Sequence, residues 1–363
     1  MRSLAIVTLL VWLCHSAYAA RRTSPPTDAV VLDQSGLRSN LTTVQSGVDV
    51  LSTTATGLQS LFIYPGVYYE QVYIPARSAN LTVYGYTNDT STYDSNTVNI
   101  TYSLALINTT SDDLTATVRA WSSNFKMYNI NILNTFGHIS SNGQNLALSA
   151  HAGGQGYYGV GLFGYQDTLL ANTGKQVYAK SKITGAIDFI FGQTAVAWLE
   201  VRLFNPSKSS VVTEHPLTVL FQHIDIRTIA AGSITASGRN STENPSWYVI
   251  TNSTVSGISS TINTRPGLNY LGRPWGVFAR VVFQYTYLSD VINAAGWSVW
   301  NAPPQERTSN VTFAEFGNYG PGSVMEEGPR AELSEQLNEP VAREDILGTG
   351  YEDEWWVDMN HLG

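Results

Sequence analysis

The sequence predicts an all-β fold in which many short strands stack as the coils of a parallel solenoid. Strand-like runs of aliphatic and aromatic residues follow one another at short intervals, separated by the glycine, asparagine and serine residues that favour turns. Helical periodicity is almost absent. In addition, Gln144, Gln166, Asp167 and Asp188 recur at steps of 21 or 22 residues. A constant period of that size is typical of one solenoid coil.

The predicted elements begin with a short helix and continue as strands. Residues 43–51 have the spacing of a short helix, which we expect to cap the N-terminal end of the solenoid. The strand-like runs lie at residues 61–64, 72–74, 81–84, 98–102, 125–133, 177–178, 189–191, 195–201, 217–221 and 281–285. No linker-like segment divides the chain, so we expect a single solenoid domain over residues 20–325.

Residues 1–19 have the pattern of a secretory signal peptide. Arg2 supplies the positive start, residues 4–14 are apolar, and Ala17-Tyr18-Ala19 matches the small-residue cleavage pattern. The apolar stretch is too short to span a bilayer. Sequons of the form Asn-x-Ser/Thr occur at Asn40, Asn80, Asn88, Asn99, Asn108, Asn240, Asn252 and Asn310. We therefore expect a secreted, extracellular glycoprotein.

Cysteine content and charge exclude several classes of function. The single cysteine, Cys14, lies inside the signal, so the mature chain would have no disulfide, cysteine nucleophile or thiolate metal site. Residues 20–325 carry 17 acidic and 17 basic side chains. A neutral body argues against nucleic acid or an anionic membrane as a partner.

Residues 326–363 form an acidic C-terminal extension, in which 11 acidic residues stand against two arginines. We expect a solvated appendage, although Trp355-Trp356 could dock it to the body. An anionic product would be repelled if the extension lay within a Debye length of the site, which is ~8–10 Å at physiological salt.

Two aspartates at matching coil positions indicate a hydrolytic site. Residues one coil apart in a parallel solenoid lie ~4.8 Å from each other, so Asp167 and Asp188 would meet on one outer face of one sheet. Burying a carboxylate is costly unless it is paired, so two at matching positions need a reason. The alternative is that both are turn residues. That alternative fits Asp188 poorly, because the sequence Ile-Asp-Phe-Ile-Phe at 187–191 is typical of a strand.

The two glutamines favour ester hydrolysis over glycoside hydrolysis. Carboxyl groups one coil apart would also suit a retaining glycosidase. Ester cleavage, however, creates an oxyanion that is stabilised by preorganised neutral donors, and Gln144 and Gln166 could supply them. For Gln144 alone, a side-chain ladder between coils is an open alternative.

Three motifs together resemble the pectin methylesterase (pectinesterase) family. They are Gln166-Asp167-Thr168-Leu169, the segment GAIDFIFG at 185–192, and Leu271-Gly272-Arg273-Pro274-Trp275, with weaker similarity at 65–70 and 296–300. The sequons and the lack of cysteine after residue 14 are most similar to secreted fungal members. The resemblance implies a right-handed parallel β-helix that removes methyl esters from galacturonate units of pectin and releases methanol, without cofactor or metal.

The resemblance also implies roles for the polar residues. Asp188 would be the nucleophile, and Asp167 the general acid and then the general base. Gln166 and Gln144 would be the oxyanion donors, and Arg273 would hold Asp188. We expect Arg273 to keep the pKa of Asp188 low, while repulsion between the carboxylates raises the pKa of Asp167.

Aromatic residues beside these motifs would contact the sugar. Trp275, Phe191 and Tyr165 offer flat apolar surfaces, although packing between coils is the alternative for each. The expected partner is pectin, bound by a monomer, with no nucleic acid and no membrane. Two other functions remain open: a β-helix polygalacturonase or pectate lyase that cleaves the polysaccharide chain, and a non-catalytic carbohydrate-binding protein. The lyase or galacturonase would need a calcium-binding acidic cluster or further aspartates, which the sequence does not show near these motifs.

Overall fold

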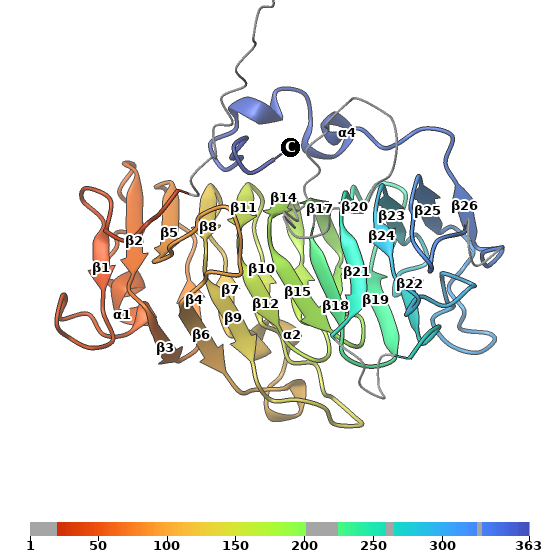
Figure 1. Cartoon of the computed structure of the whole chain (residues 1–363), viewed down its shortest axis with the longest axis horizontal. Coiled ribbons are helices and arrows are strands. Elements are labelled where there is room, and N and C mark those ends of the chain that lie inside the picture. Colours follow the sequence, from red (N-terminus) through yellow and green to blue (C-terminus); the bar gives the residue numbers. More distant parts are fainter. Residues whose placement is uncertain (1–19, 201–223, 259–264, 325–328, 363) are drawn as a thin grey trace, which may run out of the picture.

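The computed structural model describes residues 20–200, 224–258, 265–324 and 329–362. The predicted signal peptide, the strand predicted at 217–221 and the start of the acidic extension at 326 lie outside the described residues. Within the described ranges, the strands form three parallel sheets around one elongated hydrophobic core (Figure 1). The fold is therefore a parallel β-helix, as the coil-length period predicts.

The bounds of the strands, in spatial order and for the described part of the chain, are as follows. The first sheet contains β1 (Val30–Leu32), β2 (Gln59–Ile63), β5 (Leu81–Gly85), β8 (Phe125–Tyr128), β11 (Gln155–Tyr158), β14 (Thr173–Ala179), β17 (Thr194–Glu200), β20 (Trp247–Thr251), β23 (Arg280–Gln284), β25 (Thr312–Phe316) and β26 (Ser334–Gln336). The second sheet contains β22 (Asn269–Pro274), β19 (Gly232–Ser237), β16 (Ile190–Gly192), β13 (Leu169–Ala171), β10 (Leu148–Ala150), β7 (Val118–Ala120) and β4 (Val72–Ile74). The third sheet contains β24 (Tyr287–Leu288), β21 (Thr254–Gly257), β18 (Asp225–Thr228), β15 (Lys182–Gly185), β12 (Gly161–Phe163), β9 (Asn131–Asn134), β6 (Val98–Tyr102) and β3 (Gly66–Tyr69).

Each coil visits the first, the third and then the second sheet, as β11, β12 and β13 do before β14 starts the next coil. In the second sheet, Leu148 pairs with Leu169, and Leu169 pairs with Ile190, so one coil takes 21 residues here. All three side chains are fully buried. Because successive side chains of a strand point to opposite faces, these stacked aliphatic residues fill the core while their neighbours face outward.

The corners between the sheets account for the main difference from the predicted strands. The single strand expected at 125–133 is two strands, β8 and β9, which belong to the first and the third sheet. The chain turns between them at Asn129, whose φ is 54°. Asparagine tolerates this left-handed conformation better than most residues. The apolar run is therefore continuous in sequence but bent in space.

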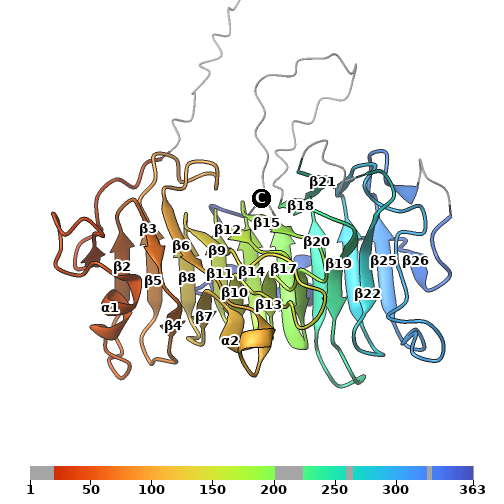
Figure 2. The same ribbon diagram turned by 90° about the horizontal axis from the view of Figure 1, so that it is seen from below.

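The short helices α1 (Val44–Asp49) and α2 (Asp112–Thr115) lie in connections between strands (Figure 2). Helix α1 begins at Thr43, whose hydroxyl accepts a hydrogen bond from the Ser46 N–H. It buries Val44 and Val48 against the N-terminal part of the core; its role as a cap stays a prediction. Helices η1 (Leu106–Asn108) and α2 lie in the connection between β6 and β7. In the described residues, no helix is both long and apolar enough to cross a membrane.

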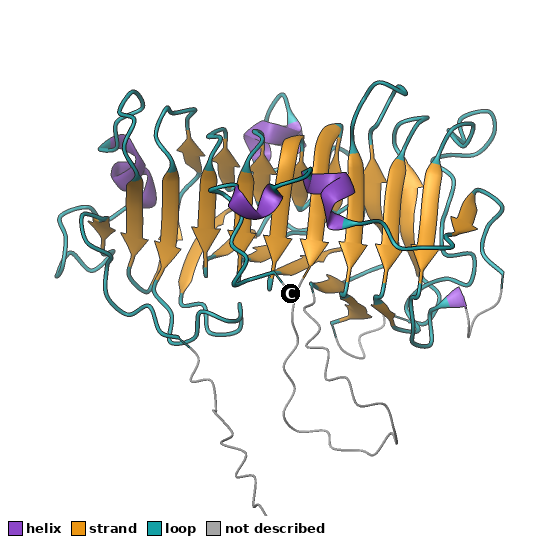
Figure 3. Ribbon diagram, turned by 90° about the horizontal axis from the view of Figure 1, so that it is seen from above, coloured by secondary structure: helices purple, strands orange, loops and turns teal. Residues whose placement is uncertain are grey.

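The C-terminal segment lies across the outer face of the first sheet (Figures 1 and 3). It contains α4 (Arg343–Leu347) and η3 (Tyr351–Asp353). Trp356 is only 3% exposed and packs in one apolar cluster with Tyr158 and Trp198 of the sheet. Trp355 borders this cluster and carries the Lys126 ammonium over its ring at 4.1 Å. The expectation of a solvated appendage is wrong, whereas docking through Trp355 and Trp356 is confirmed.

Candidate active site

Both predicted catalytic aspartates lie at the corner where the chain passes from the third to the second sheet. Asp167 follows β12 and precedes β13, and Asp188 follows β15 and precedes β16. Their φ angles are 62° and 51°, in the left-handed region that aspartate tolerates better than most residues. The expectation that Asp188 is a strand residue is wrong, because the chain turns there before the strand begins. Both aspartates therefore lie in turns between strands.

Backbone hydrogen bonds hold these corners in register. The Asp167 N–H donates to the Ile187 carbonyl at 3.0 Å, and Gln166 forms a parallel bridge with Ile187. The buried Asn145 side-chain oxygen accepts from the Gln166 N–H at 2.9 Å, while the Asn145 backbone N–H donates to the Gln166 carbonyl at 3.0 Å. Asp167 and Asp188 therefore match across one coil, and Gln144, the residue before Asn145, is carried to the same edge.

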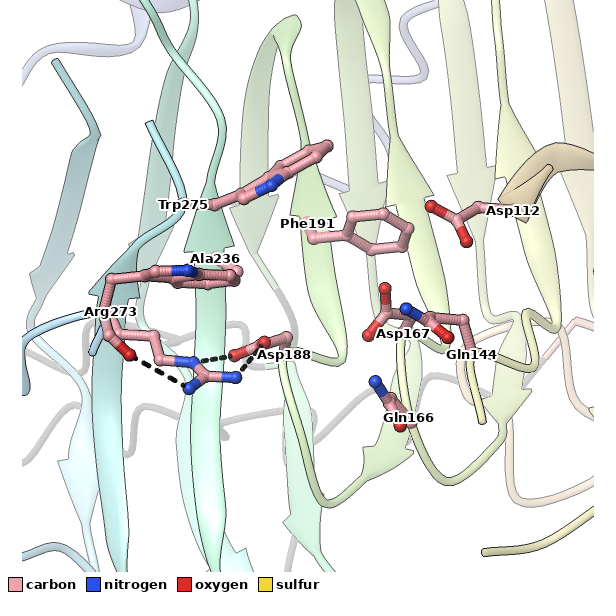
Figure 4. A pocket seen from close by; sticks show the side chains of 10 residues that line it. Asp112, Gln144, Gln166, Asp167, Asp188, Phe191, Ala236, Arg273 and Trp275 are labelled. Carbon is pink, nitrogen blue, oxygen red and sulfur yellow. Dashed lines mark hydrogen bonds and ion pairs between the residues drawn. The ribbon is translucent and has the colours of Figure 1, made fainter. Parts of the chain in front are cut away.

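These corners form one wall of a pocket on the outer face of the second sheet (Figure 4). The residues that line it are Asp112, Gln144, Gln166, Asp167, Asp188, Phe191, Ala236, Arg273, Trp275 and Trp300. The structure therefore brings together all the residues with expected catalytic roles and two of the three expected sugar-binding aromatics. The third aromatic, Tyr165, does not line this pocket. Its ring packs against His138 at a centroid distance of 4.8 Å.

Three lining residues were missed by sequence reasoning: Asp112, Ala236 and Trp300. Ala236 on β19 pairs with both Phe191 and Arg273, but a small apolar residue carries no chemical signal. Trp300 ends the weak motif at 296–300, which gave a usable but unspecific signal. Asp112 comes from α2, outside the constant period, so no spacing argument could find it.

Arg273 holds Asp188 through two hydrogen bonds. The Arg273 Nε donates to Asp188 Oδ1 at 2.9 Å, and Nη2 donates to Oδ2 at 2.6 Å. The guanidinium also lies 4.4 Å from the ring centroid of Trp300. A bidentate, charge-assisted pair fixes the orientation of a carboxylate more strictly than a single contact does. Asp188 is therefore presented to the pocket in one orientation.

Burial changes the pKa values of this ion pair. It raises the pKa of Asp188 above its ordinary value, although the hydrogen bonds and the charge of Arg273 oppose the shift. The expectation that the pKa of Asp188 stays low is therefore not met. For Arg273, burial lowers the pKa, but the contacts with Asp188 outweigh it and leave the pKa raised. The guanidinium thus remains protonated beside its carboxylate.

Asp167, the second aspartate of the pair, also has a raised pKa. Burial raises its pKa well above the ordinary value, and the charges of Asp188 and Asp112 raise it further. The charge of Arg273 and a hydrogen bond from Gln166 oppose this shift. Of the two neighbouring aspartates, only Asp188 has the bidentate arginine. The pocket therefore contains one aspartate held by a cation and a second aspartate whose pKa lies well above its ordinary value.

Two acceptor atoms in the pocket are buried and lack a hydrogen-bond partner within the described structure. They are Gln144 Oε1 and Asp112 Oδ1. Figure 4 shows Gln144 and Gln166 on the Asp167 side of the pocket and Arg273 on the opposite side. Buried polar atoms are rarely left unpaired unless a ligand or water satisfies them. The pocket thus has an aspartate held by arginine, a second aspartate, two carboxamides and free acceptors that a polar ligand can satisfy.

Comparisons with known proteins agree with this arrangement. The pectinesterase family model matches residues 28–332. A pectinesterase from Aspergillus niger is 46% identical over 97% of this chain and 97% of its own length, and one from Aspergillus aculeatus is 43% identical over 96% of each. The crystal structure of a deglycosylated Aspergillus niger pectin methylesterase superposes with a TM-score of 0.79, at 33% identity over 94% of this chain and all of the other. The chain therefore belongs to the pectinesterase family.

Proposed function

We propose that this protein is a pectin methylesterase, which hydrolyses the methyl esters of galacturonate units in pectin and releases methanol. The observation that carries the proposal is the pairing of the arginine-held carboxylate of Asp188 with the carboxylic acid of Asp167 in one pocket. Hydrolysis of an ester by two carboxyl groups needs one group ionised and the other protonated. The bidentate contact with Arg273, which Asp188 makes and Asp167 does not, favours ionisation of Asp188 over Asp167.

In the first half of the reaction, Asp188 attacks the ester. A carboxylate oxygen of Asp188 bonds to the C6 carbonyl carbon, and the carbonyl oxygen becomes an oxyanion. The amides of Gln166 and Gln144 stabilise this negative charge. The bond from C6 to the methoxy oxygen then breaks, and Asp167 donates its proton to the departing methanol. The product of this step is an acyl-enzyme anhydride on Asp188.

In the second half, water releases the acid. Asp167, now a carboxylate, accepts a proton from a water molecule that attacks C6. The bond between C6 and the Asp188 oxygen breaks, so the galacturonic acid leaves and Asp188 is again a carboxylate held by Arg273. Asp167 ends the cycle protonated. The charges of both aspartates are thereby restored.

An apolar platform beside the catalytic group supports the sugar. The rings of Phe191 and Trp275 lie 6.0 Å apart, and both pack with Leu170 and Ala236 on the outer face of the second sheet. Flat apolar side chains bind the less polar faces of sugar rings, and the tryptophan N–H remains available for a hydroxyl. The methyl ester of an uncharged unit would lie against this platform, with its carbonyl toward the aspartates.

Incubation of the protein with highly methylated pectin tests the proposal. Released methanol, new chain ends and unsaturated products are measured in the same reaction. We expect methanol without chain cleavage. Chain ends or unsaturated products without methanol would instead indicate a galacturonase or a lyase, which the pectinesterase relatives do not favour.

We further propose that the protein is secreted as a monomeric glycoprotein. The sequon asparagines that are exposed and so open to modification are Asn40, Asn88, Asn108, Asn240 and Asn310. The side chain of Asn252, by contrast, donates to Glu200 at 3.3 Å. Expression in a fungal host tests secretion by recovery from the medium. Mass spectrometry before and after deglycosylation identifies the modified sites, and light scattering gives the oligomeric state.

A further inference from the structure

Asp112 is a third carboxyl group in the pocket, and the proposed chemistry does not use it. It is the first residue of α2, and Figure 4 shows its carboxylate turned toward the side of the pocket where Asp167 and Gln144 lie, far from Arg273. Its Oδ1 atom is buried and has no hydrogen-bond partner in the described structure. An unpaired buried carboxylate oxygen is costly, so a structural role alone does not explain it.

The neighbouring aspartate shows what a structural carboxylate looks like at this place. Asp113 accepts hydrogen bonds from Arg119 at 2.6 and 2.9 Å, from Ser149 at 2.7 Å and from Trp121 at 3.2 Å. Both oxygens of its carboxylate accept hydrogen bonds from the protein. Asp112 has none of these partners. The two residues are adjacent in sequence, yet only Asp113 fastens α2 to the second sheet.

We propose that Asp112 is a specificity-determining residue that favours an uncharged, methylated galacturonate unit next to the unit under attack and disfavours a free carboxylate there. The inference rests on the proposed function of this pocket. A sugar hydroxyl of either kind of unit can donate to the unpaired Oδ1 atom, so discrimination between the two units comes from charge. When Asp112 is ionised, a neighbouring free carboxylate would meet like charge at short range, whereas a methyl ester would not, and Arg273 is already bound to Asp188. Burial raises the pKa of Asp112, so this repulsion should strengthen as the pH rises.

The consequence concerns the order in which esters are removed. Each hydrolysis creates a carboxylate on the polymer. Asp112 would disfavour rebinding with that carboxylate in the adjacent position, so the enzyme would leave the freshly demethylated stretch. The charge that would set this preference is that of Asp112, which lines the pocket.

Asp112→Asn tests the role of charge, because asparagine keeps an acceptor oxygen and removes the negative charge. The measured quantity is the ratio of kcat/KM, per ester group, for highly methylated pectin and for randomly de-esterified pectin of equal length. We expect the wild-type ratio to exceed the Asp112→Asn ratio by a factor of about three to ten, the size of one partly screened charge interaction. Asp49→Asn is the matched control, because it removes the same charge from the exposed end of α1.

Two further measurements keep the inference testable. Asp112→Ser replaces the carboxylate with a small hydroxyl and serves if the asparagine variant does not fold; it should lower the ratio in the same direction. In the wild type, raising the salt from about 0.02 M to about 0.5 M should lower the ratio, because the Debye length shrinks. A ratio that is equal in wild type and folded Asp112 variants, and insensitive to salt, would overturn the inference. Absence of methanol release by the wild type would instead overturn the proposed function.

Discussion

The outer faces of the first and second sheets are built by the same coils, yet they treat buried carboxyl groups in opposite ways. On the first sheet, Asp358 of the docked C-terminal segment accepts from the Tyr128 hydroxyl at 2.8 Å and lies 3.0 Å from His361. Although burial opposes it, these contacts leave the pKa of Asp358 well below its usual range. On the second sheet, burial and two neighbouring carboxylates raise the pKa of Asp167. The two groups differ in depth, since Asp167 is buried and Asp358 is half-buried, and they also differ in partners.

Glu200 on the first sheet is another buried carboxylate with polar partners. It is 1% exposed, and its Oε2 atom accepts from Trp198 and from Arg343 of α4, each at 2.8 Å. The C-terminal segment thus covers a face whose charges are matched. The pocket face carries Asp112 without a partner at Oδ1 in the described structure. Buried polar atoms without a protein partner are the ones that a bound ligand can satisfy. The difference between the two faces can be tested by mutation.

The largest expected effect comes from Asp188→Asn. The amide cannot form the acyl intermediate, so turnover should fall by a factor on the order of 10⁴ or more. Asparagine tolerates the left-handed backbone at this position, so thermal unfolding should stay close to that of the wild type. Methanol release and circular dichroism are measured on the same sample. A folded variant that keeps a large share of the activity would remove Asp188 from the nucleophile role.

Replacing the carboxamides should produce a smaller loss. Gln166→Ala should lower kcat on the order of a hundredfold with little change in KM, as expected for an oxyanion donor. Gln144→Ala should behave in the same way if Gln144 is also an oxyanion donor. Initial rates over a range of pectin concentrations separate the two parameters. If KM alone changes, these residues bind the sugar and do not act on the oxyanion.

Trp356→Ala tests the first-sheet face without touching the pocket. Removing an indole that is 3% exposed should lower the free energy of unfolding by about 3–5 kcal/mol, as measured by chemical denaturation. Activity per folded molecule should not change, because this residue packs on the sheet face away from the pocket. A matched loss of kcat would show that the two faces are coupled.

The smallest expected effect is a change in the free energy of unfolding that has opposite signs on the two faces. The raised pKa of Asp167 means that this group favours folding while protonated and loses that benefit as pH rises through its folded pKa. The lowered pKa of Asp358 means that it stabilises the fold above its unfolded pKa and loses that benefit as pH falls through its folded pKa. At pH 7, Asp167→Asn should therefore stabilise the protein and Asp358→Asn should destabilise it, each by about 1–2 kcal/mol.

Denaturation curves at several pH values check both signs. The gain from Asp167→Asn should disappear at low pH, where the wild-type carboxyl is protonated in both states. The loss from Asp358→Asn should shrink as the pH falls toward the folded pKa of Asp358. Shifts of equal sign at pH 7 would contradict the proposed difference between the faces.

Much of the fold was predictable because the coil period is visible in the sequence. The step of 21 residues between Asp167 and Asp188 is also the register of Leu169 with Ile190. The corners were not predictable in the same way, since an apolar run such as 125–133 continues through a turn at Asn129. A hydrophobic run indicates burial but not direction. Because the strands before and after a corner are both buried, the run does not show where the chain turns.

The pocket residues that recur with the coil period were predictable, and those outside the period were not. Asp167 and Asp188 are found by spacing and composition. Asp112 enters from a loop helix, and Trp300 from a segment after the last strand of the second sheet. Such residues reach the pocket only through the tertiary arrangement of their loops. Tyr165 shows the converse, since adjacency to Gln166 in sequence did not carry its ring into the pocket.

The position of the acidic segment also changes the interpretation of its charge. Its apolar contacts are with the first sheet, whereas the pocket opens on the second, beyond the core (Figures 1 and 4). The structure does not support repulsion of product by this segment at the groove.

The left-handed corners have a consequence for engineering. Asp167 and Asp188 share their backbone conformation with Asn124, Asn129 and Asn252, whose φ angles are 49°, 54° and 45°. Asparagine and aspartate are nearly isosteric and tolerate this conformation for the same reason. The scaffold therefore offers further corners where a carboxyl group can be installed without new backbone strain. At Asn129 and Asn252, however, an acid would also lose the amide N–H that donates to Thr92 and to Glu200, so the backbone permits the exchange where the side-chain partners do not.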